Sequence, residues 1–232
     1  MTGPPLAVVI PARQEAARLP GLLAQLAQAP QLVGEVLVVD AGSDDATALV
    51  ASLAGARVLH SGANRGQQLA LGVAASSAPW LLLLHADARL PAGWAPALVA
   101  ALADGDRQAW AFRLAIDGGD PALRLVEAAV WLRSLCWQLP YGDQGLLLSR
   151  RQLVAAGGIR PLPLMEDLEL VQRLRRQVPI RLLPLALRVD GRRWRRLGVL
   201  GTSWTNWRLR RAWRRGVPAP ILAEIYRGGP WG

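Results

Sequence analysis

The chain has 232 residues, of which 52% are hydrophobic, so it can bury the core of one large α/β domain and general disorder is excluded. Its single cysteine, Cys136, excludes an internal disulfide and any cysteine-based zinc cluster. The net charge is +10, and residues 173–232 hold fifteen arginines against only Asp190 and Glu224. This basic C-terminal part is expected to meet an anionic partner, which could be membrane phospholipid, phosphate or nucleic acid.

Short apolar segments predict four strands in the first half of the chain, at Leu6–Ile10, Val36–Val39, Arg57–His60 and Trp80–Leu84. Helical segments are expected between and after them, at about 16–29, 45–53 and 65–75 and again after 90–91. Ser43 or Asp44 is expected to cap the second of these helices. The alternation predicts βαβ units and a mostly parallel central sheet flanked by helices. In such sheets, ligands bind beyond the carboxyl ends of the strands.

One uncharged stretch, Gly66 to Ala86, could suggest a membrane span. Its glutamine, glycine, serine and proline residues favour a helix, a turn and a buried strand instead. The N-terminus also lacks a basic segment followed by an apolar one, so no secretory signal is expected and the protein is predicted to be cytoplasmic.

The second half of the chain is less regular. An amphipathic helix is expected at 123–138, a loop entering a strand at 142–149, and a helix at 165–176. Without internal repeats or a low-complexity linker, residues 1–196 are interpreted as one domain and residues 197–232 as a basic extension rich in tryptophan and arginine.

Acidic residues follow two of the predicted strands and begin one of the predicted helices. Asp40 and Asp87 come at the ends of strands, and Glu166 and Asp167 come at the start of a helix. Each could instead be a turn residue or a helix cap, because short acidic side chains favour those positions.

Several segments, in their order and spacing, resemble motifs of the family 2 glycosyltransferases, which have the GT-A fold. These are Pro11-Ala12-Arg13-Gln14-Glu15, Asp40, Asn64-Arg65-Gly66, His85-Ala86-Asp87, Gly142-Asp143-Gln144-Gly145, Met165-Glu166-Asp167 and Arg192-Arg193-Trp194. The sequence departs from the family pattern at Gln14, where asparagine is common, at His85, which replaces the first aspartate of Asp-x-Asp, and at Asp190, where processive members have glutamine. The resemblance covers about residues 6–195 and is nearest to a small bacterial subgroup with the His-Ala-Asp variant.

The resemblance implies a metal-dependent, inverting transfer of a sugar from a UDP- or GDP-sugar to an acceptor hydroxyl by residues 1–196. A cation neutralises the charge that grows on the leaving diphosphate, and one carboxylate with the diphosphate can hold Mg²⁺ or Mn²⁺. Asp87 is the candidate metal ligand, and Asp40 would accept a hydrogen bond from the base. His85 could donate to a ribose hydroxyl, ligate a softer metal such as Mn²⁺, or simply be packed.

The remaining candidate residues divide between acceptor and nucleotide. Asp167 is the candidate base that takes the proton of the acceptor hydroxyl, and Glu166 or Asp143 would orient the acceptor. Arg193 would stabilise the leaving diphosphate or would be an ordinary surface arginine. Other candidates for the nucleotide pocket are Pro11, Ala12, Glu15, Arg65 and His85. Glu169 is expected to be a solvated acid on the helix surface.

Two other functions are compatible with parts of the sequence, and the extension has more than one possible role. A sugar-1-phosphate nucleotidyltransferase is disfavoured because the 11–15 loop has neither glycine nor lysine. A non-catalytic module that binds a polyanion would gain nothing from acids at strand ends. Tryptophans among arginines suit peripheral contact with the inner face of the membrane and a lipid-linked acceptor, or packing on the domain. Nucleic acid is not an expected partner.

Overall fold

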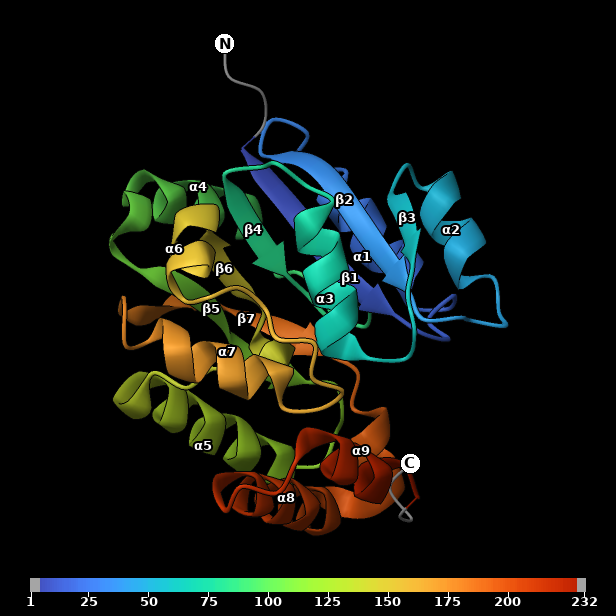
Figure 1. The fold of residues 1–232 in the computed structure, drawn as a ribbon, viewed down its shortest axis with the longest axis vertical. Helices are drawn as coiled ribbons and strands as arrows, with labels where there is room; N and C mark the ends of the chain where they lie inside the picture. The colour runs from blue at the N-terminus through green and yellow to red at the C-terminus, as the bar shows by residue number, and fades with distance from the viewer. Residues whose placement is uncertain (1–4, 229–232) are drawn as a thin grey trace.

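The computed structural model describes residues 5–228 and is built around a seven-stranded sheet (Figure 1). The strand order is β3-β2-β1-β4-β6-β5-β7. The strands are β1 (Leu6–Ala12), β2 (Val33–Asp40), β3 (Arg57–His60), β4 (Trp80–Leu83), β5 (Ala109–Ile116), β6 (Leu146–Ser149) and β7 (Ile180–Val189). Strand β6 is antiparallel to β4 and β5, whereas the other paired strands are parallel. The expected mostly parallel α/β sheet is therefore confirmed.

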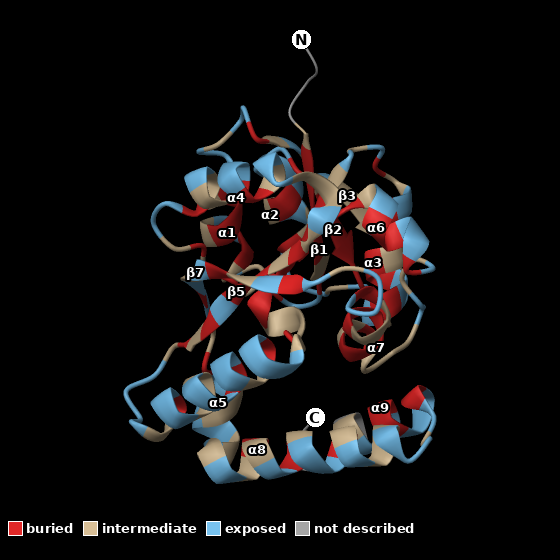
Figure 2. Ribbon diagram, turned by 90° about the vertical axis from the view of Figure 1, so that its left-hand side faces the viewer, coloured by how far each residue is buried: buried red, intermediate tan, exposed pale blue. Residues whose placement is uncertain are grey.

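Helices cover both faces of this sheet, and a further group lies beyond it (Figure 2). They are α1 (Leu19–Leu26), α2 (Thr47–Leu53), α3 (Arg65–Ala74), α4 (Trp94–Ala103), α5 (Ala122–Trp137), α6 (Arg150–Ala155), α7 (Glu166–Leu174), α8 (Arg192–Arg214) and α9 (Ala219–Gly228). Helices α1 and α4 pack on one face, and α3, α6 and α7 pack on the other.

The alternation of side chains along β1 explains the two cores. Leu6, Val8 and Ile10 belong to the cluster with α1 and α4, whereas Ala7 and Val9 belong to the cluster with α3, α6 and α7. All five are fully buried, as expected for a central strand of a parallel sheet. This sandwich fixes the carboxyl ends of β1 and β4 next to each other.

Helices α5 and α8 lie side by side below the sheet in both views (Figures 1 and 2). A small cluster links them to it, in which Leu123 and Val130 of α5 pack with Leu114 and Val189 from β5 and β7. Helix α8 is broken at Gly198, whose φ of 71° lies in the left-handed region. Within residues 5–228, no helix is both long enough and apolar enough to cross a bilayer.

The four predicted N-terminal strands are all present, but the predicted cap of α2 is wrong. The N-cap residue is Ala46, with no side-chain cap. Asp45 accepts a hydrogen bond from the Thr47 amide at 3.0 Å, while Ser43 donates its amide hydrogen to Asp40 at 3.0 Å. Hydrogen bonds from backbone amides to the Asp40 and Asp45 side chains therefore hold the loop before α2. The stretch Gly66–Ala86 forms most of α3, a turn and β4, as expected.

Candidate active site

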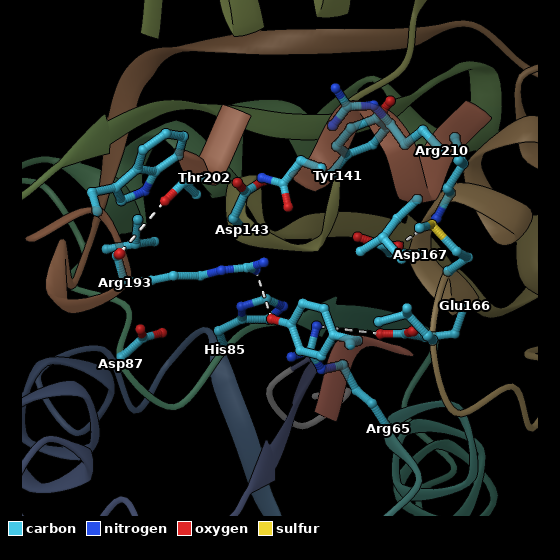
Figure 3. Close-up of a pocket in the computed structure, with 18 of the residues that line it drawn as sticks. Arg65, His85, Asp87, Tyr141, Asp143, Glu166, Asp167, Arg193, Thr202 and Arg210 are labelled. Carbon is cyan, nitrogen blue, oxygen red and sulfur yellow. Dashed lines mark hydrogen bonds and ion pairs between the residues drawn. The ribbon is translucent and has the colours of Figure 1, made fainter. Parts of the chain in front are cut away.

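A cleft opens at the carboxyl ends of β1 and β4, facing α8 and α9 (Figure 3). It consists of two adjoining cavities of about 340 Å³ each, which share Arg65, His85 and Asp87. One, here the β1 lobe, is lined by Pro11, Ala12 and Glu15 among others. The other, here the α7 lobe, is lined on its acidic side by Asp143, Glu166 and Asp167, with Arg193 and Arg210 across from them.

Asp167 is held in the α7 lobe by two backbone amides. Its Oδ2 accepts a hydrogen bond from the Gly142 N–H at 2.7 Å, and its Oδ1 accepts one from the Leu168 N–H at 2.7 Å. Met165, just before α7, has a φ of 65°, a backbone conformation that is uncommon outside glycine. This turn starts α7 so that the Asp167 carboxylate is fixed in orientation.

Gly142 is required for this arrangement by space rather than by backbone angle. A Cβ added at Gly142 would lie 2.8 Å from His85 Nε2 and 3.2 Å from Asp167 Oδ2. The glycine therefore lets the loop before β6 approach both side chains, and the spacing of Gly142, His85 and Asp167 depends on it.

Two further carboxyl groups of the α7 lobe are buried, and each has an oxygen without a hydrogen-bond partner in the described chain. Glu166 is only 2% exposed and lies 3.5 Å from Arg65 Nη1, yet its Oε1 has no hydrogen-bond partner among the described residues. Burial raises its pKa to about 7. Asp143 Oδ1 also lacks a partner there, and burial raises the pKa of Asp143 to about 6. Both acids can therefore exchange protons near neutral pH.

The His85-Ala86-Asp87 segment lies at the junction of the two lobes. Burial, with Arg65 as a second cause, lowers the pKa of His85 to about 3, so its imidazole is neutral at neutral pH. Burial and then the nearby Glu15 raise the pKa of Asp87. Within residues 5–228, the Asp87 carboxylate forms no ion pair, and no three His, Cys, Asp or Glu residues cluster as metal ligands. A cation at Asp87 would thus need ligands beyond a cluster of acidic, histidine or cysteine side chains.

Arg193 lines the α7 lobe, and part of its guanidinium group has no partner among the described residues. Its Nη1 donates to the Tyr226 hydroxyl at 2.6 Å, and its guanidinium lies 4.5 Å from the centre of that ring. Its Nε and Nη2 are buried and have no hydrogen-bond partner in the described part of the chain. These two N–H groups form the fork that binds carboxylates and phosphates in bidentate fashion.

The β1 lobe, in contrast, is built from paired charges. Glu15 is 7% exposed and accepts from Arg192 Nη2 at 2.5 Å and from Arg18 Nη1 at 3.3 Å. Gln14 before it has a φ of 57°, which asparagine adopts more readily than glutamine. This gives a physical reason for the asparagine that the family often has at this position.

Arg65 reaches both lobes because Gly66 allows α3 to approach the loop before α7. A Cβ at Gly66 would lie 2.4 Å from the Arg160 carbonyl oxygen, and the Gly66 amide donates to Leu162 O at 3.1 Å. The N-cap of α3 is Asn64, whose side chain accepts from the Gln67 amide. The Asn64-Arg65-Gly66 segment is thus a docking point between two parts of the chain.

Two predicted residues lie differently from expectation. Asp40 is 2% exposed and engaged by Ser43, and its neighbour Ala41, rather than Asp40 itself, lines the β1 lobe. The expectation that Glu169 is a solvated acid is wrong. Glu169 is 6% exposed and pairs with Arg173 at 2.6 Å and Arg160 at 3.0 Å, because α7 turns it toward the loop before the helix.

Sequence reasoning gave no role to several side chains that line the α7 lobe, among them Tyr141, Arg192, Arg210 and Tyr226. Tyr141 is next to a recognised motif and Arg192 is part of one, so their positions could have suggested them. Arg210 and Tyr226 lie on α8 and α9, and no motif connects them with the strand ends.

A family model described as "Glycosyl transferase family 2" matches residues 7–155 of the chain. The chain belongs to glycosyl transferase family 2. The predicted family is therefore confirmed, and the protein is a glycosyltransferase. The search of curated proteins gave no match.

Among solved structures, the chain is similar to glucosyl-3-phosphoglycerate synthase from Mycobacterium tuberculosis in several complexes. The complex with Mn²⁺, UDP and glucosyl-3-phosphoglycerate is 24% identical, with a TM-score of 0.59 over 81% of this chain and 71% of that one. The complex with phosphoglyceric acid is 25% identical, with a TM-score of 0.59 over 81% of this chain and 71% of that one. The complex with Mg²⁺ and UDP is 24% identical, with a TM-score of 0.58 over 81% of this chain and 70% of that one. This similarity confirms the expected GT-A fold of the glycosyltransferase.

Proposed function

We propose that this family 2 glycosyltransferase moves a sugar from a UDP- or GDP-sugar to an acceptor hydroxyl, with inversion at the anomeric carbon and with a divalent cation. The observation that carries the proposal is the position of Asp87. It lines both lobes, between the β1 lobe and the acids and open arginine of the α7 lobe. A diphosphate at this junction would have its nucleotide on one side and its sugar on the other.

The nucleotide is assigned to the β1 lobe. Pro11, Ala12 and Arg65 supply its walls, and the paired Glu15 keeps its shape. A direct contact between Asp40 and the base would require Asp40 to exchange its hydrogen bond with Ser43 for one with a base N–H. Otherwise Asp40 serves the base by holding the 41–43 loop. Both roles place the base beside Ala41.

The residues at the junction fit a hard cation such as Mg²⁺ or Mn²⁺. Asp87 offers a carboxylate with no ion pair in the described chain, and such cations accept one protein carboxylate together with phosphate oxygens and water. When bound, the cation would neutralise charge on the diphosphate. His85, neutral and next to Asp87 in the motif, is proposed to donate to a ribose hydroxyl or to serve as a softer ligand. Two of the three solved structures named above contain UDP, one with Mn²⁺ and the other with Mg²⁺.

Asp167 is proposed as the base of the transfer. Its two amide hydrogen bonds fix the carboxylate and leave lone pairs for the acceptor hydroxyl. Asp143 and Glu166 are proposed to orient the acceptor, since a protonated carboxyl group can donate to an acceptor oxygen and an ionised one can accept. On the leaving-group side, the unpartnered Nε and Nη2 of Arg193 would bind the departing diphosphate.

We also propose that α8 brings the enzyme to the inner face of the membrane, as the sequence suggested. Support comes from Leu200, Trp204 and Trp207 on α8, which are 86%, 57% and 45% exposed and lie among arginines. Indole rings favour the headgroup region, and guanidinium groups meet phosphate there. The His-Ala-Asp variant is in turn proposed as the mark of a small bacterial subgroup.

The decisive experiment is a thermal-shift panel of UDP, GDP, UTP and sugar nucleotides, each with and without Mn²⁺ or Mg²⁺. Saturating diphosphate with metal should raise the midpoint by about 5 °C or more, because ligand binds only the folded state. Diphosphate without metal should give a smaller rise. A preference for UTP with sugar phosphate turnover would favour a nucleotidyltransferase instead. The anomer formed, measured by NMR, tests inversion, and a retained configuration would contradict it.

A further inference from the structure

A third cavity, of about 400 Å³, adjoins the α7 lobe on the side of α5 and α8. Its walls carry five arginines, Arg133, Arg210, Arg211, Arg214 and Arg215, and no acidic residue lines it. We call this cavity the basic basin. It uses none of the groups that the proposed donor site requires.

The basin is shaped by the spacing of residues on α8. Arg210 and Arg211 lie three and four residues after Trp207, and Arg214 lies one further turn on, so the four share one face of the helix. The Trp207 ring lies 5.3 Å from the Arg211 guanidinium. These contacts orient the arginines toward a common space.

Tyr141 anchors the opposite wall. The Arg133 guanidinium lies 3.6 Å from the centre of its ring and that of Arg210 lies 5.7 Å from it. Arg133 also donates to Leu139 O at 2.9 Å and to Gln144 Oε1 at 3.1 Å, so its role includes holding this wall. The α8 arginines differ. Within the described chain, Arg210, Arg211, Arg214 and Arg215 form no ion pair.

Unpaired like charges that share one cavity repel each other, and a bound anion would relieve that repulsion. A phosphate group suits the basin better than a carboxylate, because it has more charge and more acceptor oxygens to satisfy several guanidinium groups at once.

The basin is connected with the proposed chemistry through two side chains. Tyr141 and Arg210 line both the basin and the α7 lobe, which contains Asp167. An anion held in the basin would therefore leave the attached part of its molecule directed into the α7 lobe. We propose that the basic basin binds a phosphate or diphosphate group of the acceptor and so presents a neighbouring acceptor hydroxyl to Asp167. This inference rests on the proposed function and specifies the class of acceptor.

The test uses the full chain saturated with UDP and Mn²⁺, so that the donor site is filled. The probe is glycerol 3-phosphate, with glycerol as the uncharged comparison, measured by isothermal titration calorimetry. A variant carrying R211Q, R214Q and R215Q removes basin charge. The control variant carries R107Q, R176Q and R181Q, which are exposed arginines outside the basin, and it has the same net charge. We expect glycerol 3-phosphate to bind and glycerol not to bind. The basin variant should bind the phosphate at least about tenfold more weakly, and the control should match the native protein.

A second arm separates a lipid phosphate from a soluble one. Vesicles of phosphatidylcholine with or without phosphatidic acid are sedimented with each protein. Retention on phosphatidic acid that the basin variant loses and the control keeps indicates a lipid-linked phosphate. Binding of glycerol 3-phosphate without vesicle retention indicates a soluble phosphorylated acceptor. If neither probe distinguishes the basin variant from its control, the inference is overturned.

The outcomes also separate this inference from the proposed function. If UDP fails to bind with Mn²⁺, the donor assignment fails before any phosphate is added. If UDP binds equally to all three proteins but glycerol 3-phosphate and vesicles do not separate them, only the basin assignment fails. Slow hydrolysis of the sugar nucleotide in the absence of acceptor should be equal in the three proteins.

Discussion

The β1 lobe and the α7 lobe adjoin each other but differ in how completely their buried charged groups are hydrogen-bonded. In the β1 lobe, Glu15 is neutralised by Arg18 and Arg192. In the α7 lobe, Asp143, Glu166 and Arg193 each keep a buried polar atom without a hydrogen-bond partner in the described chain. A buried polar atom that is hydrogen-bonded supports structure, whereas one without a hydrogen-bond partner costs free energy unless a ligand completes it. We infer that the β1 lobe is preformed, whereas the α7 lobe has hydrogen-bonding groups that a bound substrate would satisfy.

The largest effect is expected at Asp87, where the two lobes meet. Replacing Asp87 with alanine should lower transfer by about 10³-fold or more, since the stabilisation of diphosphate charge is worth several kcal/mol. The metal-dependent part of the UDP thermal shift should disappear with it. The exposed Asp104→Ala variant is the matched control. A D87A protein that keeps its metal-dependent shift would remove Asp87 from the cation site.

Asp167→Asn comes next and acts on the α7 lobe alone. The asparagine oxygen can still accept from the Gly142 amide and so keep the contact with the loop before β6, whereas its NH2 group cannot accept from the Leu168 amide as Asp167 Oδ1 does. Loss of a general base should lower kcat by about 10²–10³-fold, while the Kd for UDP with Mn²⁺ stays near the native value. Steady-state kinetics and calorimetry measure the two quantities. Transfer at the native rate would reject Asp167 as the base.

Gly142→Ala tests how closely the reactive wall must be packed. The added Cβ would meet His85 Nε2 and Asp167 Oδ2, so one of them must move by a few tenths of an ångström. We expect kcat to fall by about tenfold or more, because displaced catalytic groups lose rate steeply. The Kd for UDP should change by less than kcat, because of the two displaced side chains only His85 is assigned to the nucleotide. Gly119→Ala, at a position with open space around the added Cβ, is the control and should behave like the native protein.

The smallest effect is a pH dependence of stability at Glu166. Its pKa is about 7 in the folded protein against an ordinary value of 4.5, so the folded state binds more protons than the unfolded state between these limits. The native protein therefore loses stability as pH rises through this window. Glu166→Gln does not titrate, so its melting temperature should exceed the native one by an amount that grows from pH 4.5 to about 7 and is constant above.

Melting curves of both proteins across that pH range, with Asp104→Asn as a control, measure the difference. A constant difference in melting temperature at all pH values would show that burial does not raise the pKa of Glu166. The contrast between the two lobes would then rest on fewer observations.

The sequence by itself determined the residues at the ends of the parallel strands. Apolar segments located β1 to β4, and the rule that ligands meet the carboxyl ends of such strands pointed to Glu15, Arg65 and Asp87, which do line one cleft. It did not indicate β5 and β7, because Arg113 interrupts the apolar residues of β5, and Arg181, Pro184 and Arg188 interrupt those of β7.

Only the tertiary structure decided which groups are paired. Arg193 meets Tyr226 across 33 positions, and Arg192 meets Glu15 across 177. Glu169 became buried because α7 docks on the loop before it, and Arg210 reached the cleft because α8 folds back beneath α5. Local propensity fixes which residues begin a helix or end a strand, but burial and charge pairing depend on contacts between distant segments, which exist only after the chain has packed.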